Sequence, residues 1–342
     1  MKKNKVLSFG EMLLRVSLDA GGEWLASNKL PFYVGGAELN VATALALWDV
    51  PSAYLSALPD NDMCKQIVED IEHKKVDASR MIYEGERLGL YYLAQGKDLK
   101  NAGVIYDRAH SSYATLDRSK IDWNKILEDV SWFHFSAICP ALNQNVADIC
   151  LDAVKAASEK GIFVSLDLNY RAKLWKYGKT PKEIMTQLAP YCNLIMGNIW
   201  AANQMLGTHL EDIFLHKNIY TQDELLHQGT HTSEEIIDMY PKCSIVANTF
   251  RFDHGAEGIH YYTSLYSNNT LKVSQTWEKE TVYNRVGSGD CFMAGLIYGY
   301  YNELPEEETL EFATAAAVDK LDIAGDATTS TAEQIKSKIS KK

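Results

Sequence analysis

The sequence predicts an α/β protein with a mainly parallel central sheet flanked by helices and a small β-sheet lid. Short apolar runs alternate with longer amphipathic segments along most of the chain, which is typical of parallel strands joined by helices. Two stretches, about 11–33 and 88–116, break this rhythm with β-rich patterns that lack helical spacing. With 342 residues, 46% of them hydrophobic, the chain can bury a large core without disulfides or a structural metal.

Each element follows from a local pattern. Apolar runs predict strands at 5–9, 52–57, 131–137, 161–167, 194–196 and 244–247. Helical spacing predicts helices at 36–47, 63–74, 143–160, 288–301 and 310–323, and a final solvated helix in the lysine-rich tail 332–342.

The two β-rich stretches are interpreted as one small sheet that could cover a site. In the second stretch, strands at 88–93 and 103–106 are separated by a polar turn at 96–101. Because no repeat, low-complexity tract or linker divides the chain, we interpret residues 1–342 as one domain that includes this lid.

The charge balance excludes some partners. The formal net charge is -11 and the pI about 5.3, and an acidic surface repels nucleic acid and anionic membranes. We therefore expect neither as a partner. An acidic substrate would need a local group of arginines to overcome this field.

The cysteines and the chain start indicate a cytoplasmic location. The six cysteines are scattered without metal-ligand spacing, so we expect reduced, mostly buried thiols. The first residues include a Glu and an Arg within an apolar run, which does not fit a signal peptide, and no segment has the length of a membrane span.

A glycine-rich turn opens the helix predicted at 288–301. Gly287, Ser288 and Gly289 can turn the backbone so that N–H groups point one way, and the helix N-terminus adds unpaired donors and a positive dipole end. This combination suits a phosphate. The short pattern alone favours an ordinary helix start with Asp290 as a cap or first-turn charge.

Asp290 would lie beside a bound phosphoryl group and could accept the proton of an attacking hydroxyl. We expect the helix dipole to lower the pKa of this carboxyl and make it a weak base. A weak base suffices, because phosphoryl transfer depends more on positioning than on proton removal.

The turn resembles the GAGD signature of the ribokinase-like (phosphofructokinase-B type) sugar kinases. Other segments match motifs of that family in order and spacing: VLSFGEMLLR at 6–15, VGGAELNVA at 34–42, LPDND at 58–62, DLNYR at 167–171, and Gly197-Asn198. The resemblance implies a ribokinase-like fold, ATP and Mg²⁺, and often a homodimer or higher homo-oligomer paired through the lids.

By the same resemblance, site roles fall on particular residues. Asp290 would be the general base, with Gly287, Ser288 and Gly289 forming the anion hole. The remaining assignments are sugar contacts at Gly35, Gly36 and Asn40, and nucleotide contacts at Asn198, Thr249, Arg251, Gly287 and Gly289. No residue is assigned as a direct metal ligand.

The lid and the 167–175 segment resemble 2-keto-3-deoxygluconate kinases within the family. Arg108 and Arg171 would clamp the sugar carboxylate, while Tyr91, Tyr106 and Asn169 would contact the sugar. Arginine suits a planar carboxylate because its donors are paired. Surface ion pairs and half-buried strand tyrosines explain these residues equally well without the resemblance.

Three positions depart from the family pattern. Asn284 stands where Asp is usual, Ala201 where the Glu of N-x-x-E is expected, and Pro59 where Gly is usual. Two alternatives to the keto-deoxy acid kinase stay open. One is another sugar kinase of the same fold, such as a fructokinase. The other, indicated by the two lost carboxylates, is a weakly active sugar or nucleotide sensor.

Overall fold

A computed structural model gives the fold and describes residues 4–18, 29–94, 103–216, 220–255 and 257–339. Its central sheet has the strand order β14-β13-β12-β11-β10-β9-β1-β4, with β15 also paired to β13. The strands are β1 (Lys5–Phe9), β4 (Ser52–Leu55), β9 (Val130–Ser136), β10 (Phe163–Asp167), β11 (Leu194–Gly197), β12 (Ile245–His254), β13 (Gly258–Ser267), β14 (Thr270–Val273) and β15 (Trp277–Lys279).

The predicted mainly parallel sheet is confirmed, with an antiparallel edge that the sequence pattern does not reveal. Strands from β4 to β12 pair in parallel, whereas β13 pairs antiparallel with β12, β14 and β15. A long hairpin thus replaces a crossover helix at this edge.

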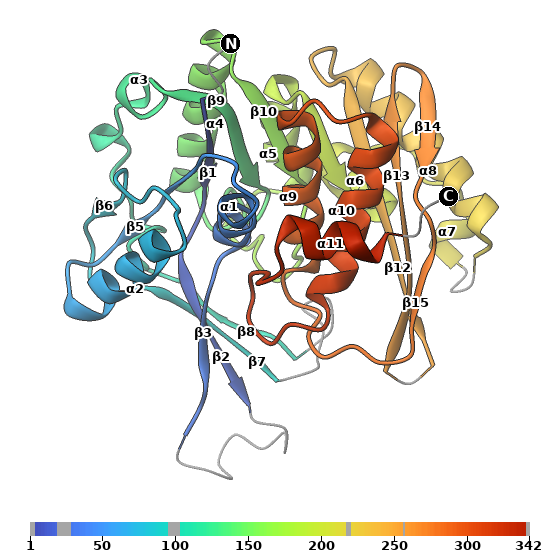
Figure 1. The fold of residues 1–342 in the computed structure, drawn as a ribbon. Helices are drawn as coiled ribbons and strands as arrows, with labels where there is room; N and C mark the ends of the chain where they lie inside the picture. The colour runs from blue at the N-terminus through green and yellow to red at the C-terminus, as the bar shows by residue number, and fades with distance from the viewer. Residues whose placement is uncertain (1–3, 19–28, 95–102, 217–219, 256, 340–342) are drawn as a thin grey trace.

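Helices cover both faces of the sheet because its strands alternate their apolar side chains (Figure 1). Val6 and Trp132 pack into the core beneath α1, α9 and α10, whereas Leu7 and Phe133 pack toward α4, α5 and α6. The helices are α1 (Ala37–Leu47), α2 (Asp62–His73), α3 (Trp123–Ile126), α4 (Gln144–Glu159), α5 (Pro181–Leu188), α6 (Ile199–Leu206), α7 (Ile213–His216), α8 (Gln222–Met239), α9 (Ser288–Tyr301), α10 (Glu306–Lys320) and α11 (Ala332–Lys338).

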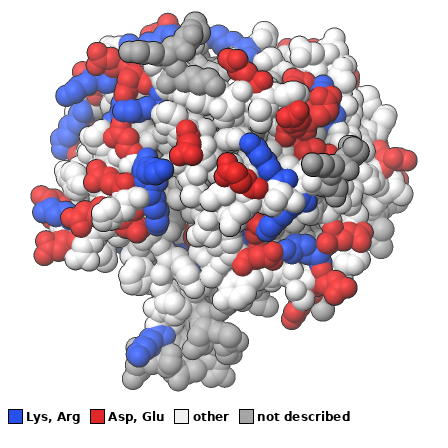
Figure 2. Space-filling model, in the orientation of Figure 1, with Lys and Arg blue, Asp and Glu red and all other residues white. Residues whose placement is uncertain are grey.

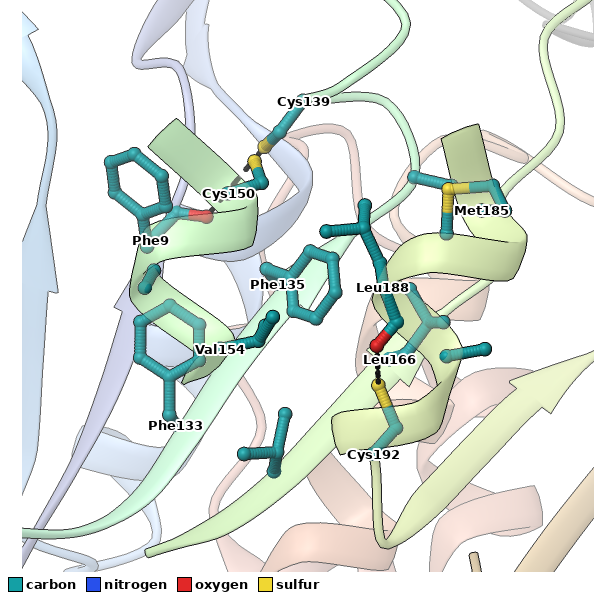
Figure 3. Close-up of a cluster of buried hydrophobic side chains, with 14 of the residues drawn as sticks. Phe9, Phe133, Phe135, Cys139, Cys150, Val154, Leu166, Met185, Leu188 and Cys192 are labelled. Atoms are coloured by element: carbon teal, nitrogen blue, oxygen red, sulfur yellow. Dashed lines mark hydrogen bonds between the residues drawn. The ribbon is translucent and has the colours of Figure 1, made fainter. Parts of the chain in front are cut away.

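All six cysteines are buried and free, which confirms the expectation of buried thiols. Figure 3 shows Cys139, Cys150 and Cys192 among the aromatic and aliphatic side chains under α4 and α5. They act there as small apolar residues in the core.

The predicted small separate sheet is confirmed, and two distant stretches of the chain form it. The strands β2 (Leu13–Leu18), β3 (Phe32–Gly35), β7 (Gly89–Ala94) and β8 (Ile105–Asp107) lie in the order β3-β2-β7-β8, below the central sheet in Figure 1. The predicted end at 116 is wrong, because Tyr113 and Leu116 are buried in the main core. The turn expected at 96–101 lies outside the described residues.

Several predicted boundaries are wrong where tertiary contacts decide them. The strand predicted at 244–247 continues to His254, because β13 pairs with its whole length. The run at 52–57 is divided between β4 and the short β5 (Ala57–Leu58), which pairs with β6 (Ile82–Tyr83). Helix α10 begins at Glu306, and α11 is only partly solvated, since Ile335 is buried.

Acidic and basic side chains are interspersed over the face seen in Figure 2. In the described ranges, no helix is both long enough and apolar enough to span a bilayer.

Candidate active site

A cleft of about 600 Å³ lies between the lid, the start of α9 and the carboxyl ends of the parallel strands. Nearly all predicted site residues line it: Gly36, Asn40, Tyr91, Tyr106, Arg108, Asn169, Arg171, Asn198, Thr249, Arg251, Gly287, Ser288, Gly289 and Asp290. A larger but more open hollow borders residues 114–119 and 143–145, away from these groups. The position at the strand ends is where α/β sheets commonly bind ligands.

Gly35 does not line the cleft but permits its construction. A Cβ atom there would lie 2.5 Å from the Asp326 carboxylate, so a larger residue would displace that side chain. At Gly36 the backbone φ is 139°, and a Cβ would lie 2.5 Å from the Glu11 carbonyl oxygen. The glycine pair therefore lets β3 pass directly into α1 beside buried carboxylates.

The glycine-rich turn has the backbone required for an anion site. Gly287 is in the left-handed region at φ 80°, and a Cβ there would come within 1.9 Å of the Asp326 carbonyl oxygen. No side chain caps α9, and Ser288 donates its hydroxyl to Ala317 O at 3.0 Å. Within this turn, the donors left for an anion are therefore backbone N–H groups. A Cβ on Gly289 would meet nothing within 4 Å.

A buried cation lies behind this turn. Lys320, at the end of α10, is fully buried, and its Nζ donates to Ile323 O at 3.1 Å. Burial lowers the pKa of Lys320 to about 8, and the carboxylate of Asp326 opposes that effect. Its charge adds to the positive end of the α9 dipole.

Asp290 points from the first turn of α9 toward α1. Asn40 Nδ2 donates to Asp290 Oδ2 at 2.7 Å, and Asp290 is only 8% exposed. Burial raises the pKa of Asp290 to about 7, the Asn40 hydrogen bond lowers it, and the negative charges of Asp167 and Glu38 raise it further. The expected depression of this pKa by the helix dipole is therefore wrong, because desolvation dominates.

Asp167 forms a second acidic position in the cleft, at the end of β10. Its Oδ1 accepts from the Asn169 N–H at 3.0 Å. Burial raises the pKa of Asp167 to about 7, while the Asn169 hydrogen bond and the Arg171 charge lower it. Such paired, perturbed carboxyls in a cleft are typical of acid–base sites.

The two predicted clamp arginines lie in different environments. Arg108 is buried and pairs through Nε with Glu11 Oε2 at 2.5 Å, so part of its charge is already balanced. Arg171 is half-buried, and its Nη1 donates to Tyr170 O at 3.0 Å. Its charge favours the ionised forms of Asp167 and Asp290, which places the guanidinium near both.

The predicted nucleotide residues take partly structural roles. Asn198 caps α6 by accepting from the Ala201 N–H at 2.9 Å. Thr249 donates its hydroxyl to Gly197 O at 3.2 Å. Arg251 lies within β12, not after it as predicted, since that strand continues to His254. All three nevertheless border the cleft.

Asn284 has contacts that the family's usual aspartate could not make. Its Nδ2 donates to Ala324 O at 2.8 Å and to Gly325 O at 3.2 Å, while its Oδ1 accepts from the Val286 N–H at 3.0 Å. A carboxylate has no donor for the two carbonyls. The amide therefore holds the loop before Asp326 against the turn at 286–289.

Sequence reasoning missed Asp326, the acidic group that joins the lid to the core. Both Nε and Nη2 of Arg15 lie 2.7 Å from Asp326 Oδ1, and the Tyr91 hydroxyl donates to Asp326 Oδ2 at 3.0 Å. Asp326 follows α10 in a region without a strong pattern. In the sequence, Asp326 is marked only by the preceding Gly325, and this Gly-Asp pair does not by itself indicate a functional site.

The cleft does not contain a ready protein cage for a metal. Across the described ranges, no group of three or more His, Cys, Asp or Glu side chains could hold an ion. This fits Mg²⁺ carried largely by phosphate oxygens and water, the usual arrangement for that ion with nucleotides.

Comparisons with known proteins agree with this geometry. The family model for pfkB family carbohydrate kinases matches residues 3–329. A 2-dehydro-3-deoxygalactonokinase from Haloferax volcanii is 26% identical over 97% of this chain and 95% of its own length. A probable chloroplastic fructokinase-6 from Arabidopsis thaliana is 25% identical over 94% of this chain and 78% of its own.

Solved structures give the same result. The crystal structure of a 2-dehydro-3-deoxygluconokinase from Thermotoga maritima has a TM-score of 0.87 and 31% identity, covering 98% of both chains. A fructokinase from Xylella fastidiosa solved with bound ATP has a TM-score of 0.73 at 16% identity, with 98% of both chains covered, and so shows the shared fold. The chain therefore belongs to the pfkB family of carbohydrate kinases and is an ATP-dependent sugar kinase with the ribokinase-like fold.

Proposed function

We propose that this sugar kinase transfers the γ-phosphate of ATP to the primary hydroxyl of 2-keto-3-deoxygluconate. The observation that carries the proposal is the shared cleft of Asp290, Arg108 and Arg171. A base at the start of α9, one guanidinium directly after lid strand β8 and another after β10 suit an acceptor that carries both a hydroxyl and a carboxylate. The gluconate and galactonate kinases among the relatives support it.

The charges of the cleft support an acidic sugar despite the acidic protein. Arg171, Lys173, Arg251 and Arg285 line the cleft together with Arg108. Glu11, Glu38, Asp167, Asp290 and Asp326 also line the cleft, and the basic side chains offset their charge. A local basic group of this kind is what an anionic substrate needs in a protein with a net charge of -11. In the proposal, Arg108 and Arg171 bind the carboxylate, and Tyr91, Tyr106 and Asn169 contact the sugar.

In the proposed reaction, Asp290 accepts the proton of the primary hydroxyl while Asn40 holds its carboxyl in place. The N–H groups of residues 287–289 and the α9 dipole stabilise the charge on the transferred phosphoryl group. Asn198, Thr249 and Arg251 would contact the nucleotide. ATP with Mg²⁺ supplies the phosphoryl group and neutralises phosphate charge. The lid excludes water from the cleft.

The test is ADP release with a panel of acceptors: 2-keto-3-deoxygluconate, its C4 epimer 2-keto-3-deoxygalactonate, fructose and ribose. We expect the highest kcat/KM for the gluconate. Better turnover of fructose or ribose would contradict the acid substrate, and equal turnover of the two epimers would widen the proposal to both keto-deoxy acids.

Arg171→Ala tests the carboxylate contact more cleanly than a change at Arg108, which would leave buried Glu11 without its partner. Losing a charged hydrogen bond costs about 1.5–3 kcal/mol, so KM for the keto-deoxy acid should rise roughly 10- to 100-fold. As a matched control, Arg118→Ala removes an exposed arginine that pairs with Asp152, and KM should not change. An unchanged KM in Arg171→Ala would remove Arg171 from the substrate site.

A further inference from the structure

Two histidines lie side by side on the exposed face of α8. His227 and His231 are one helical turn apart, with side chains 65% and 56% exposed. Their Nε2 atoms lie 3.1 Å from each other, and the ring planes are inclined by 80°. Neither residue lines the cleft, and the kinase reaction makes no use of them.

The separation of the two nitrogens fits a shared metal ion. Imidazole nitrogens bind zinc at about 2.0–2.1 Å, and an N–metal–N angle of about 90–110° places the two nitrogens about 2.8–3.4 Å apart. The observed 3.1 Å lies in the middle of that range. A hydrogen bond between the rings would have a similar length. Whether the pair forms that hydrogen bond or binds a metal ion depends on which ring nitrogens carry protons.

The neighbouring carboxylates favour the metal. His227 Nδ1 lies 3.5 Å from Glu211 Oε1, and His231 Nδ1 lies 3.6 Å from Glu234 Oε2. Neither contact is a hydrogen bond, but the negative charge on this side of each ring attracts the ring proton to Nδ1, the side on which metal-bound histidines usually have their partner. Both Nε2 lone pairs would then face each other without a proton between them, and a cation satisfies both.

The helix holds the pair in place through its opposite face. Gly229 and Ser233 are buried there, and Asn248 Nδ2 on β12 donates to Ser233 Oγ at 3.1 Å. Because this packing fixes the backbone of α8, the two residues that carry the rings are held one turn apart, with their Nε2 atoms already 3.1 Å from each other. A site whose ligands are already positioned binds more tightly than a flexible one.

From this geometry we infer that α8 carries a surface site for a divalent transition-metal ion, with Nε2 of His227 and His231 as its protein ligands. Water completes the coordination, since no third His, Cys, Asp or Glu converges on the pair within the described residues. The ion belongs to the class of Zn²⁺, Ni²⁺ and Cu²⁺, which imidazole prefers, whereas Mg²⁺ prefers oxygen ligands.

The experiment is calorimetric titration of the tag-free, full-length protein with ZnCl₂, NiCl₂ or CuCl₂, without nucleotide. We expect one site per chain that binds Cu²⁺ more tightly than Ni²⁺ or Zn²⁺. His227→Gln and His231→Gln should each lower the metal affinity by at least on the order of 10- to 100-fold. That is the loss seen when a residue that supports a metal ligand from behind is removed, and these changes remove the ligand itself. His73→Gln, at the exposed end of α2, is the control and should not change it.

A second readout identifies the ligands directly. The electron paramagnetic resonance spectrum of bound Cu²⁺ should show coupling to two imidazole nitrogens in the wild type and to one in either variant. Unchanged affinity in both variants, or equal loss in the His73 control, would overturn the site. Kinase turnover with Mg²⁺ should be the same in all four proteins, so failure of this inference is separable from failure of the proposed substrate.

Discussion

The chemistry of the Asp290 carboxyl is decided by desolvation and not by the helix on which it lies. Its place in the first turn of α9 is evident from the sequence, and the dipole alone would favour the ionised form. Burial and the charges of Asp167 and Glu38 outweigh the dipole and raise the pKa to about 7. Sequence spacing cannot show this effect, because α1 and β10 bring those side chains together only in the folded chain.

We predict that kcat/KM rises with pH through a midpoint near 7, because Asp290 must be deprotonated to accept a proton. Asn40→Ala removes a hydrogen bond that lowers this pKa, so the midpoint should move to higher pH. Asp167→Asn removes a negative charge that raises it, so the midpoint should move to lower pH. Full pH–rate profiles of the three proteins test this, and a flat profile between pH 5.5 and 8 would contradict it.

The same carboxyl should make folding stability depend on pH. Between its unfolded pKa of 3.8 and its folded pKa of about 7, the native state holds a proton that the unfolded state has lost. Stability therefore falls as the pH rises across this interval, by at most about 4 kcal/mol. Asp290→Asn should thus be more stable than the wild type at pH 8 and similar at pH 4. Denaturant unfolding at both pH values measures this, and a constant difference between them would argue against it.

The residues that sequence reasoning located are those tied to local patterns. The start of α9 is one such pattern, because the four consecutive residues at 287–290 indicate a glycine turn followed by an acidic first-turn residue. Asp326 was missed because its importance comes from Arg15, more than three hundred positions away in the chain. The ion pair between Glu11 and Arg108 was missed for the same reason.

At the scale of elements, periodicity predicts which segments form helices and strands, and tertiary pairing sets their lengths. The helix at 288–301 and the strand at 5–9 were predicted to the residue, since glycine turns and polar flanks bound them. Strand β12 is longer than its apolar run because β13 supplies hydrogen bonds along its polar half. Helix α8 has mixed polarity and was not predicted; several polar residues, including Gln228 and Thr232, are buried on its inner face.

The close crossing of α9 and α10 provides an element-scale prediction. A Cβ on Gly295 would lie 2.4 Å from Ala313 Cα, so Gly295→Ala must push the two helices apart. We expect a cost of about 1–3 kcal/mol in unfolding free energy from overpacking, although alanine favours helix by about 1 kcal/mol. Gly289→Ala, where a Cβ meets nothing within 4 Å, is the matched control and should be as stable as the wild type or more stable by up to about 1 kcal/mol.

The two glycine variants should separate stability from catalysis. Gly289→Ala adds a methyl group to the turn proposed to hold the transferred phosphate, so its kcat should fall while its unfolding free energy does not decrease. Gly295→Ala should retain kcat below its melting temperature. If Gly295→Ala were as stable as wild type, the helices could adapt to the methyl group and the close contact would have no energetic role.

At the scale of the whole molecule, the buried carboxylate of Asp326 joins the lid to the turn at 286–289. Arg15 on β2 and Tyr91 on β7 both bond to Asp326, and Asn284 holds the adjacent loop against the turn at 286–289. Arg15 also lies over the Tyr33 ring at 4.1 Å, which connects β3 to the same group. Because these contacts link three lid strands to the start of α9, the position of the lid and the anion site should be coupled.

This coupling predicts that weakening the Arg15–Asp326 pair lets water enter the cleft and hydrolyse ATP. Arg15→Lys keeps the charge but loses the paired donors, and Arg15→Met removes both, so that the buried Asp326 carboxylate loses its ion-pair partner. We expect ATP hydrolysis without sugar, relative to phosphoryl transfer, to increase in the order wild type, Tyr91→Phe, Arg15→Lys, Arg15→Met. Among the variants, Tyr91→Phe should increase the ratio least, because it loses a single hydrogen bond worth about 1 kcal/mol. Arg118→Met, the same change at an exposed ion pair with Asp152, should leave the ratio unchanged. An unaltered ratio in folded Arg15→Lys and Tyr91→Phe would mean that water is excluded by the strands of the lid themselves, independently of their attachment to Asp326.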